Sequence, residues 1–579
     1  MKNYLTRLLT LAVIFAVSFG GFYGCGDKDA KDTQEVSQEE VQKMEQQFKE
    51  FASNLDNQIK EVYNQMTDSY FRASISGLEV DYTKTADIEK KLNEMMSDST
   101  TFNKLKEFKE SGAIQDPLLQ RWLGELYRSY LSKQLETEKL NKMTEMQSAI
   151  EQKYSKFRAT VDGKEYNDNE VEEVLKNSTD SKKLRAVWEA HKEIGPLVAD
   201  DIIELVKMRN AAARELGFEN FHTMSLKLSD QDPEEISKLF DELDNLTRDA
   251  FADLKNEIDA TLSKRLDIKP EEMRPWHYQN RYFQEAPQIY EVNLDKYYAD
   301  QNIEKLTEDY FASQQLPIEA MVAKSSLYPQ AGKNQHAYCI DIDRDTEDVR
   351  VLCNITPSAR WMETMLHEFG HALYQKHVDQ DLPWSLKTPA HIFTTEAIAM
   401  LYGRFATSPK WMNDMKVIDE TTMNNIDETC AKILRLQQLV FSRWSQVMYR
   451  FEKSMYANPD QDLNKLWWDL VEEYQMVKRP EGRDMPDWAT KIHIASSPCY
   501  YHNYHLGELL ASQLYFKIKK DVLKVETDGA LSFYGQPEAG AYLVENVFKP
   551  GARWQWNEMI ERATGEKLTP KYYAEQFVK

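Results

Sequence analysis

Apolar side chains recur every three or four residues over long stretches of this 579-residue chain. This spacing places one apolar stripe along an α-helix, which must pack that stripe against a neighbour. In the first such stretch, the stripe covers about seven turns and consists of Val41, Met44, Phe48, Phe51, Leu55, Ile59, Val62 and Met66. Similar patterns fill residues 116–158, 181–216, 425–456 and 500–522. The sequence therefore predicts a fold built mainly from long helices.

Residues that interrupt helices are scarce, with 20 glycines and 19 prolines in the whole chain. The segment Asp232-Pro233-Glu234-Glu235 is typical of a helix start, and we expect that helix to run to about Lys264. One segment differs: residues 336–342 and 349–355 alternate as strands around a polar turn, which predicts a β-hairpin. Because no internal repeat or strong domain boundary is evident, we expect a mostly α fold with one large helical body.

The first 25 residues have the pattern of a bacterial export signal. Lys2 and Arg7 precede an apolar run from Leu8 to Phe19, which is short for a membrane span. The run leads to Gly24 and Cys25, in a pattern that resembles the lipobox in which the cysteine becomes lipidated. An ordinary secretory signal is the alternative. We expect residues 26–40 to be a polar tether, residues 41–579 to form the helical domain, and the protein to be exported to the bacterial cell envelope, in the periplasm or on the outer surface, anchored at Cys25.

Export would place the remaining cysteines in an oxidising compartment. They are Cys339, Cys353, Cys430 and Cys499. Cys339 and Cys353 flank the predicted hairpin and could pair, although connectivity cannot be deduced from a sequence.

The chain carries a formal net charge of −23, which would repel a phosphate backbone. Nucleic acid is therefore not an expected partner, whereas a peptide or another small molecule is. We expect membrane association only through the amino-terminal lipid anchor.

Residues 364–375 read TMLHEFGHALYQ and contain the pattern His-Glu-x-x-His. Residues four apart share one face of a helix, so His367 and His371 would aim two imidazoles at one point, with Glu368 beside it. This is the pattern of zinc metallopeptidases, in which the glutamate acts as general base. The alternative is a helix that carries two hydrogen-bonded core histidines.

Catalytic zinc takes three protein ligands and keeps one open position. The candidate for the third ligand is Glu396, 25 residues after His371, near the start of a second predicted helix. We interpret this glutamate as lying in the first turn of that helix, where a capping role is the alternative. Asp379 and Asp381 are nearer in sequence but fall in a predicted loop.

Several strings resemble the peptidyl-dipeptidase A family, the zinc peptidases that include angiotensin-converting enzyme. HEFGH, KHVDQDLPWSL and TEAIAMLYG are similar to that family's HEMGH, KDLPVSL and HEAIGD. The resemblance extends to residues 184–220, to QHAYCIDI, to LNKLWWDLVEEYQ and to KIHIASSPCYYHNYHLGELLASQ. It runs from about residue 40 to the carboxyl end and is strongest over residues 334–510.

The resemblance implies a zinc peptidase with a deep central channel beside the hairpin. One Zn²⁺ would be bound by His367, His371 and Glu396, with Glu368 as general base. His493 and Tyr504 would stabilise the tetrahedral intermediate. The substrate-binding residues implied by the resemblance are Lys491 and Gln279 at the terminal carboxylate, His336 and Ala337 along the channel, and Tyr500 or Tyr501 as the first tyrosine of the pair.

The chain also departs from the family pattern. Val471 and His502 stand where animal members carry chloride-binding arginines, so chloride activation is not expected. Met400 replaces an aspartate four residues after the third ligand, and Gln335 replaces the cysteine that would pair with Cys353.

Three functions fit these residues. The first is a peptidyl-dipeptidase, which would use a fixed cation to count from the free carboxyl end of an oligopeptide. The second is a zinc oligoendopeptidase or carboxypeptidase on a related helical scaffold. The third is a non-catalytic peptide-binding surface lipoprotein, which the presence of Glu368 argues against, because a structural metal site needs no base.

Overall fold

The computed structural model describes residues 37–527 and 529–578. The predicted signal peptide and most of the predicted tether lie outside these residues. The first helix begins at Gln38, capped by Ser37, so residues 38–40 belong to the helix rather than to a tether. Within the described part of the chain, no helix is both long and apolar enough to cross a lipid bilayer.

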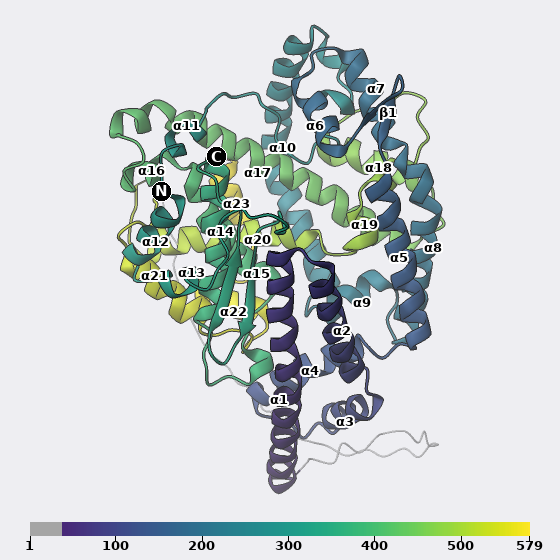
Figure 1. The fold of residues 1–579 in the computed structure, drawn as a ribbon, viewed down its shortest axis with the longest axis vertical. Coiled ribbons are helices and arrows are strands. Elements are labelled where there is room, and N and C mark those ends of the chain that lie inside the picture. Colours follow the sequence, from purple (N-terminus) through teal and green to yellow (C-terminus); the bar gives the residue numbers. More distant parts are fainter. Residues whose placement is uncertain (1–36, 528, 579) are drawn as a thin grey trace, which may run out of the picture.

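Helices dominate the fold, as the spacing of apolar residues predicted (Figure 1). The helices of the amino-terminal part are α1 (Gln38–Ser76), α2 (Glu79–Met96), α3 (Ser99–Glu110), α4 (Pro117–Leu131), α5 (Thr137–Lys156), α6 (Asp168–Asn177), α7 (Ser181–Lys192), α8 (Ile194–Glu215), α9 (Phe221–Leu228) and α10 (Pro233–Leu266). Those of the carboxy-terminal part are α11 (Asp295–Tyr298), α12 (Ile303–Ser313), α13 (Glu319–Val322), α14 (Ala359–Lys376), α15 (Ile392–Gly403), α16 (Pro409–Asp414), α17 (Glu420–Ala457), α18 (Leu463–Leu470), α19 (His493–Ser496), α20 (His502–Lys517), α21 (Pro537–Leu543), α22 (Trp556–Thr564) and α23 (Lys571–Phe577).

The predicted start at Asp232 is confirmed, because its side chain accepts the backbone N–H groups of Glu234 and Glu235 and Pro233 is the first residue of α10. The pattern over 500–522 corresponds to α20, which continues as a π-helical turn over Ile518–Val522. The stretches 116–158 and 181–216 each divide into two helices, α4 with α5 and α7 with α8.

Two small antiparallel sheets interrupt the helices. The predicted hairpin is confirmed as β3 (Tyr338–Asp343) and β4 (Asp348–Leu352), and it packs beside α14. The second sheet, β1 (Ala159–Val161) with β2 (Lys164–Tyr166), was not predicted, because strands of three residues show no clear alternation.

The hypothesised pair of Cys339 and Cys353 does not form, and both are free cysteines in the structure. The strand register explains this, because Cys339 lies opposite Val351 and Cys353 follows the last residue of β4. Cys339 instead lies 3.7 Å from the side-chain oxygen of Gln375.

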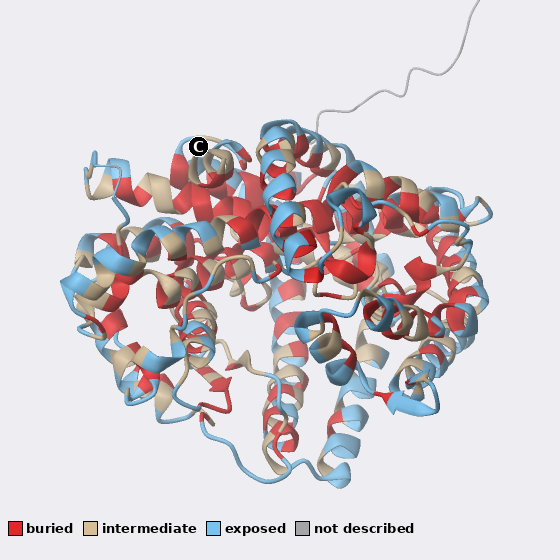
Figure 2. Ribbon diagram, turned by 90° about the horizontal axis from the view of Figure 1, so that it is seen from above, coloured by how far each residue is buried: buried red, intermediate tan, exposed pale blue. Residues whose placement is uncertain are grey.

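Helix α17 crosses the middle of the molecule (Figure 1). It contacts α8, α9, α10 and α18, and also α16, α20 and α23. Buried residues concentrate on the inward faces of the helices (Figure 2). One continuous apolar cluster therefore joins the two groups of helices, in agreement with the prediction of a single body.

Candidate metal centre

Helix α14 presents two imidazoles to one point. The rings of His367 and His371 lie with centroids 4.9 Å apart, as expected for residues one turn apart on a helix. From α15, an oxygen of Glu396 lies 3.7 Å from Nε2 of His367 and 3.8 Å from Nε2 of His371. The ligand atoms of these three residues all lie within 4.8 Å of one another. The structure thus brings together the three residues predicted to bind a metal.

Close helix packing sets the position of Glu396. Gly370 lies between the two histidines, and a Cβ added there would come within 3.0 Å of the Cα of Ala399 on α15. The absence of a side chain at Gly370 therefore allows α14 and α15 to approach closely. Helix α15 begins at Ile392, so Glu396 lies in its second turn and not in the first, as the sequence interpretation had it. A capping role for this residue is thereby excluded, because His391 is the N-cap.

A partner of His371 was missed by the sequence analysis. Nδ1 of His371 lies 2.7 Å from the hydroxyl oxygen of Thr395. If Nδ1 carries the proton, Nε2 is left with its lone pair directed toward Glu396, which is the state required of a metal ligand. Thr395 lies on α15 and His371 on α14. The contact between them depends on how the two helices pack, so the sequence carries no signal for it.

The electrostatics of the site fit a divalent cation. Burial lowers the pKa of His367 to about 4 and holds that of His371 well below its usual range, so both rings are neutral. Burial, followed by the nearby charge of Glu508, raises the pKa of Glu396 to about 7. Two neutral imidazoles and one carboxylate form a donor set that suits zinc, whose charge would stabilise the carboxylate.

Glu368 lies between the three candidate ligands and the hairpin. Its side chain is only 7% exposed. Burial, and then the charge of Glu396, raise its pKa to about 8, while a backbone hydrogen bond from Cys339 of β3 opposes this shift. The carboxyl group is therefore able to exchange a proton in the neutral pH range.

The segment that precedes α20 supplies the other predicted polar groups. The buried ammonium of Lys491 lies 5.1 Å, 5.4 Å and 5.5 Å from the ring centroids of Tyr282, Trp444 and Tyr501. The Tyr501 ring in turn lies 5.4 Å from that of His493 and 5.4 Å from that of Tyr504.

Burial, and then the charge of Glu396, raise the pKa of the phenols of Tyr500 and Tyr504, so both lie within electrostatic reach of that carboxylate. Tyr501 instead lies beside Lys491. The sequence left open whether Tyr500 or Tyr501 is the first tyrosine of the pair, and of these two it is Tyr501 that contacts Lys491.

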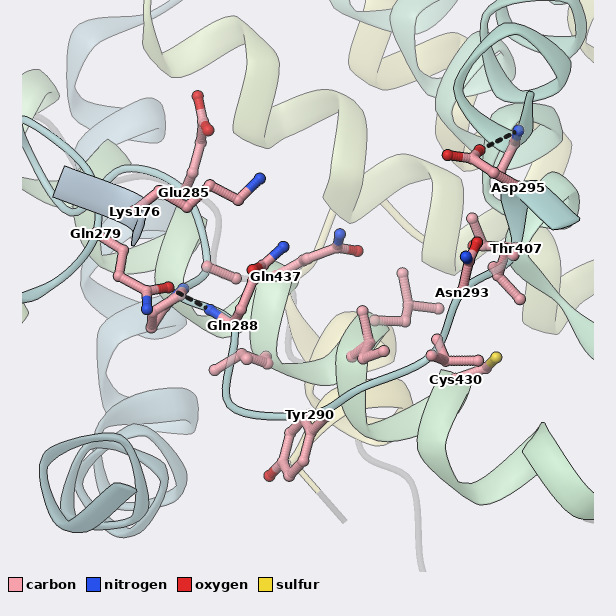
Figure 3. A pocket seen from close by; sticks show the side chains of 18 residues that line it. Lys176, Gln279, Glu285, Gln288, Tyr290, Asn293, Asp295, Thr407, Cys430 and Gln437 are labelled. Atoms are coloured by element: carbon pink, nitrogen blue, oxygen red, sulfur yellow. Dashed lines mark hydrogen bonds between the residues drawn. The ribbon is translucent and has the colours of Figure 1, made fainter. Parts of the chain in front are cut away.

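Gln279 and Lys491 were predicted to bind the same carboxylate, but Gln279 makes a different contact. Its side-chain oxygen accepts the backbone N–H of Gln288 at 2.7 Å, and it lines a cavity of about 550 Å³ with Glu285 and Gln288 (Figure 3). Lys491 is not among the residues that line this cavity. The amine of Lys491 donates to Gln284 at 2.6 Å. Gln284 lies five residues after Gln279, in the string RYFQEAP. The sequence analysis missed it, because the sequence alone does not distinguish the two glutamines as partners of Lys491.

His336 and Ala337 lie directly before β3. His336 is exposed, and its backbone N–H donates to the side chain of Asn334 at 3.0 Å. Ala337 is half-buried against the main apolar cluster. No described side-chain contact links His336 to the metal ligands, and the role of both residues along a peptide channel stays a prediction.

Residues 42–572 match peptidase family M2, described as angiotensin-converting enzyme. The chain belongs to this family. The match spans almost the whole of the described structure, and the His-Glu-x-x-His helix and Glu396 lie within it. Family M2 is a family of zinc-dependent metallopeptidases, which agrees with the donor set at this centre.

Two curated proteins share part of the sequence of this M2 member. Carboxypeptidase 1 of Bacillus subtilis (strain 168) is 26% identical over 227 residues, which are 36% of this chain and 44% of that protein. Thermostable carboxypeptidase 1 of Pyrococcus furiosus is 24% identical over 239 residues, which are 37% of this chain and 46% of that protein. The chain thus spans less than half the length of the curated relatives that it matches.

Proposed function

We propose that this protein is a zinc-dependent peptidyl-dipeptidase, which releases dipeptides from the free carboxyl end of oligopeptides. The observation that carries the proposal is the buried ammonium of Lys491. It is 6% exposed and has no carboxylate within ion-pair distance among the described residues. A buried cation of this kind is unfavourable unless an anion binds beside it.

Aromatic side chains connect this cation to the metal centre. The ring of Tyr501 contacts the ring of Tyr504, and the charge of Glu396 contributes to the raised pKa of the Tyr504 phenol. Two aromatic side chains therefore separate Lys491 from the candidate ligands. We propose that Lys491, Gln284 and Tyr501 hold the terminal carboxylate, in place of the Gln279 suggested by the resemblance.

The residues around the metal centre can perform each proton transfer. One zinc ion, when bound by His367, His371 and Glu396, supplies a Lewis acid that acidifies water and polarises the scissile carbonyl. Glu368 takes the proton of the attacking water and delivers it to the leaving amine.

The oxyanion that develops in the transition state requires hydrogen-bond donors. Tyr504 can donate its hydroxyl proton, because its pKa is raised by burial and by the charge of Glu396. His493 is neutral, because burial lowers its pKa to about 4, and it can donate one ring N–H. Its Nδ1 has no hydrogen-bond partner among the described residues.

The positions considered for chloride lack a cation. Val471 is apolar, and burial holds the pKa of His502 well below its usual range, so that its ring is uncharged. We therefore propose activity that does not depend on chloride.

The cellular context is also a proposal. The basic residues Lys2 and Arg7, the apolar run and Cys25 support export to the bacterial envelope and lipid anchoring. The net charge of −23 supports peptide rather than nucleic-acid partners.

A second candidate is a carboxypeptidase, which is the activity named for the two curated relatives. A peptide with a free carboxyl end, incubated with and without a chelator and followed by mass spectrometry, separates the two. Chelator-sensitive release of dipeptides supports the proposal. Single amino acids would support a carboxypeptidase, internal cuts an oligoendopeptidase, and binding without cleavage a non-catalytic lipoprotein. Amidation of the terminal carboxyl should strongly reduce dipeptide release.

A further inference from the structure

The segment that carries the proposed oxyanion donors contains a strained residue. His493 begins the single-turn helix α19, Tyr504 lies in the first turn of α20, and residues 497–501 join the two helices. Within this link, Cys499 has a φ of +56°, in the left-handed region that residues other than glycine rarely adopt. Such a conformation persists only where surrounding contacts fix it. The contacts to this segment therefore help to determine where the two donors lie.

A buried carboxyl group from α17 fixes the strained residue. One oxygen of Glu452 accepts the backbone N–H of Cys499 at 2.8 Å, which is the one hydrogen bond that this carboxyl group makes among the described residues. The side chain is only 2% exposed. Burial raises its pKa to about 8, so at neutral pH it is mostly an uncharged carboxyl group. Glu452 therefore acts on the link by accepting a hydrogen bond, which a glutamine could also do.

A buried guanidinium from α8 holds the same segment four residues earlier. Nη2 of Arg209 donates to the carbonyl oxygen of Ala495 at 2.7 Å. The same nitrogen donates to Gln147 of α5 at 2.9 Å, and Nη1 donates to the hydroxyl of Tyr456 at 3.2 Å. Arg209 is 5% exposed and has no carboxylate within ion-pair distance among the described residues. Its hydrogen bonds therefore go to uncharged oxygens, one of which belongs to the backbone of α19.

The two contacts enclose a short stretch of chain between the donors. Ala495 lies two residues after His493, and Cys499 lies five residues before Tyr504. Helix α19 packs against α5 and α8, the helices that supply the guanidinium and its glutamine partner (Figure 1). The ring of Tyr501 contacts the rings of His493 and Tyr504, so a displacement of this stretch would reach both donors. Neither buried group is one of the three grouped metal ligands.

We infer that Arg209 and Glu452 are positioning residues, which hold residues 495–499 so that His493 and Tyr504 point at the oxyanion of the transition state. This inference rests on the proposed function, because that function assigns the oxyanion to those two donors. In this role neither Arg209 nor Glu452 touches the substrate. Their loss should weaken binding of the tetrahedral transition state and leave binding of the planar peptide nearly unchanged.

The test compares matched variants. Glu452→Leu removes the acceptor of the Cys499 N–H, whereas Glu452→Gln keeps an acceptor oxygen. Arg209→Met removes the guanidinium, and Arg214→Met, at an exposed site on the same helix, is its control. We expect Glu452→Leu and Arg209→Met to lower kcat about tenfold, because a displaced donor loses part of the effect of about 10²- to 10³-fold that one oxyanion donor has. Glu452→Gln and Arg214→Met should behave as the wild type does.

A tetrahedral analogue provides a readout that a merely structural role would not change. The Kd of an uncleaved free-ended peptide is measured in a Glu368→Gln background, and the Ki of a phosphinic analogue of the same sequence is measured without that change. In Glu452→Leu and Arg209→Met, the phosphinic analogue should bind about tenfold more weakly, with the peptide Kd and the zinc content unchanged. Gln147→Leu, which removes one acceptor of the guanidinium at a half-buried site, replaces Arg209→Met if that variant does not fold.

The outcomes separate this inference from the proposed function. Equal losses of affinity for the peptide and the analogue, or no loss for either in the folded variants, would overturn the positioning role, as would loss of zinc. Absence of dipeptide products from the wild type would overturn the proposed function instead. The ratio of the two affinities would then still report on the position of the donors, because it requires no turnover.

Discussion

The hydroxyl of Thr395 lies 2.7 Å from Nδ1 of His371, so helix α15 both orients one candidate ligand and, through the next residue, supplies another. The family pattern assigns an orienting role to an aspartate where this chain has Met400. Thr395, five residues earlier on the same helix, makes the contact with His371 that this chain shows.

Replacing Thr395 with valine should weaken metal binding. The valine removes the hydroxyl that holds the His371 ring while keeping a similar volume, and loss of such a partner typically costs about 10- to 100-fold in metal affinity. Competition with a chromophoric chelator measures the zinc Kd. Thr395→Ser retains the hydroxyl and should bind zinc as the wild type does. An unchanged Kd in the valine variant would show that the contact does not orient the ligand.

Replacing Glu368 with glutamine should abolish turnover and spare the metal. The variant keeps the shape of the side chain but cannot accept a proton, so kcat should fall by about 10²- to 10⁴-fold. Metal analysis should find zinc content equal to that of the wild type, because Glu368 is not one of the three grouped ligands. Wild-type turnover in this variant would contradict the catalytic role of Glu368.

The preference for a free carboxyl end should weaken as pH rises. Burial, and secondly the charge of Arg281, lower the pKa of Lys491 to about 7. Only the protonated amine attracts a carboxylate, so the free enzyme loses this attraction above pH 7. The ratio of kcat/KM for a free-ended peptide to that for its amide should fall by up to about tenfold per pH unit there. In Lys491→Gln the ratio should be low and independent of pH.

Glu452 should make the folded state less stable as pH rises. Burial raises its pKa to about 8, although the backbone N–H of Cys499 donates to it at 2.8 Å. Between the ordinary carboxyl pKa and 8, the folded protein binds a proton that the unfolded chain releases, so stability falls with increasing pH in this window.

Thermal melting at several pH values measures this effect. Relative to Glu452→Gln, the wild type should lose stability on the order of 1 kcal/mol per pH unit within the window. Glu428→Gln, at an exposed site on α17, provides the matched control. Parallel profiles for the wild type and Glu452→Gln would contradict the prediction.

Gly370→Ala should separate the two ligand-bearing helices. Its Cβ would come within 3.0 Å of the backbone of Ala399. Overpacking of this kind typically costs about 1–3 kcal/mol, and a shift of α15 would move Glu396 away from the histidines. We expect a lower Tm together with a weaker zinc Kd. At Gly124 of α4 the nearest atom is the flexible end of Arg128 at 3.4 Å, so Gly124→Ala should leave both values unchanged or raise Tm slightly.

Features that depend on neighbours in the chain were predictable. The stripes of α1, α10 and α17, the start of α10 at Asp232 and the hairpin of β3 and β4 all follow from local periodicity and capping. The shared orientation of His367 and His371 was predictable for the same reason, because residues four apart lie on one face of a helix. The strands β1 and β2 are only three residues long, which is too short to show the alternation of apolar and polar residues that predicts a strand.

By itself the sequence determined the elements, the two imidazoles and the base between them. Tertiary structure alone decided which groups complete the site: Glu396 and Thr395 reach the histidines only because Gly370 permits close helix packing, and Gln284 rather than Gln279 reaches Lys491. The physical reason is that periodicity specifies the direction of a side chain from its own helix, whereas the distance between side chains on different helices depends on how those helices pack.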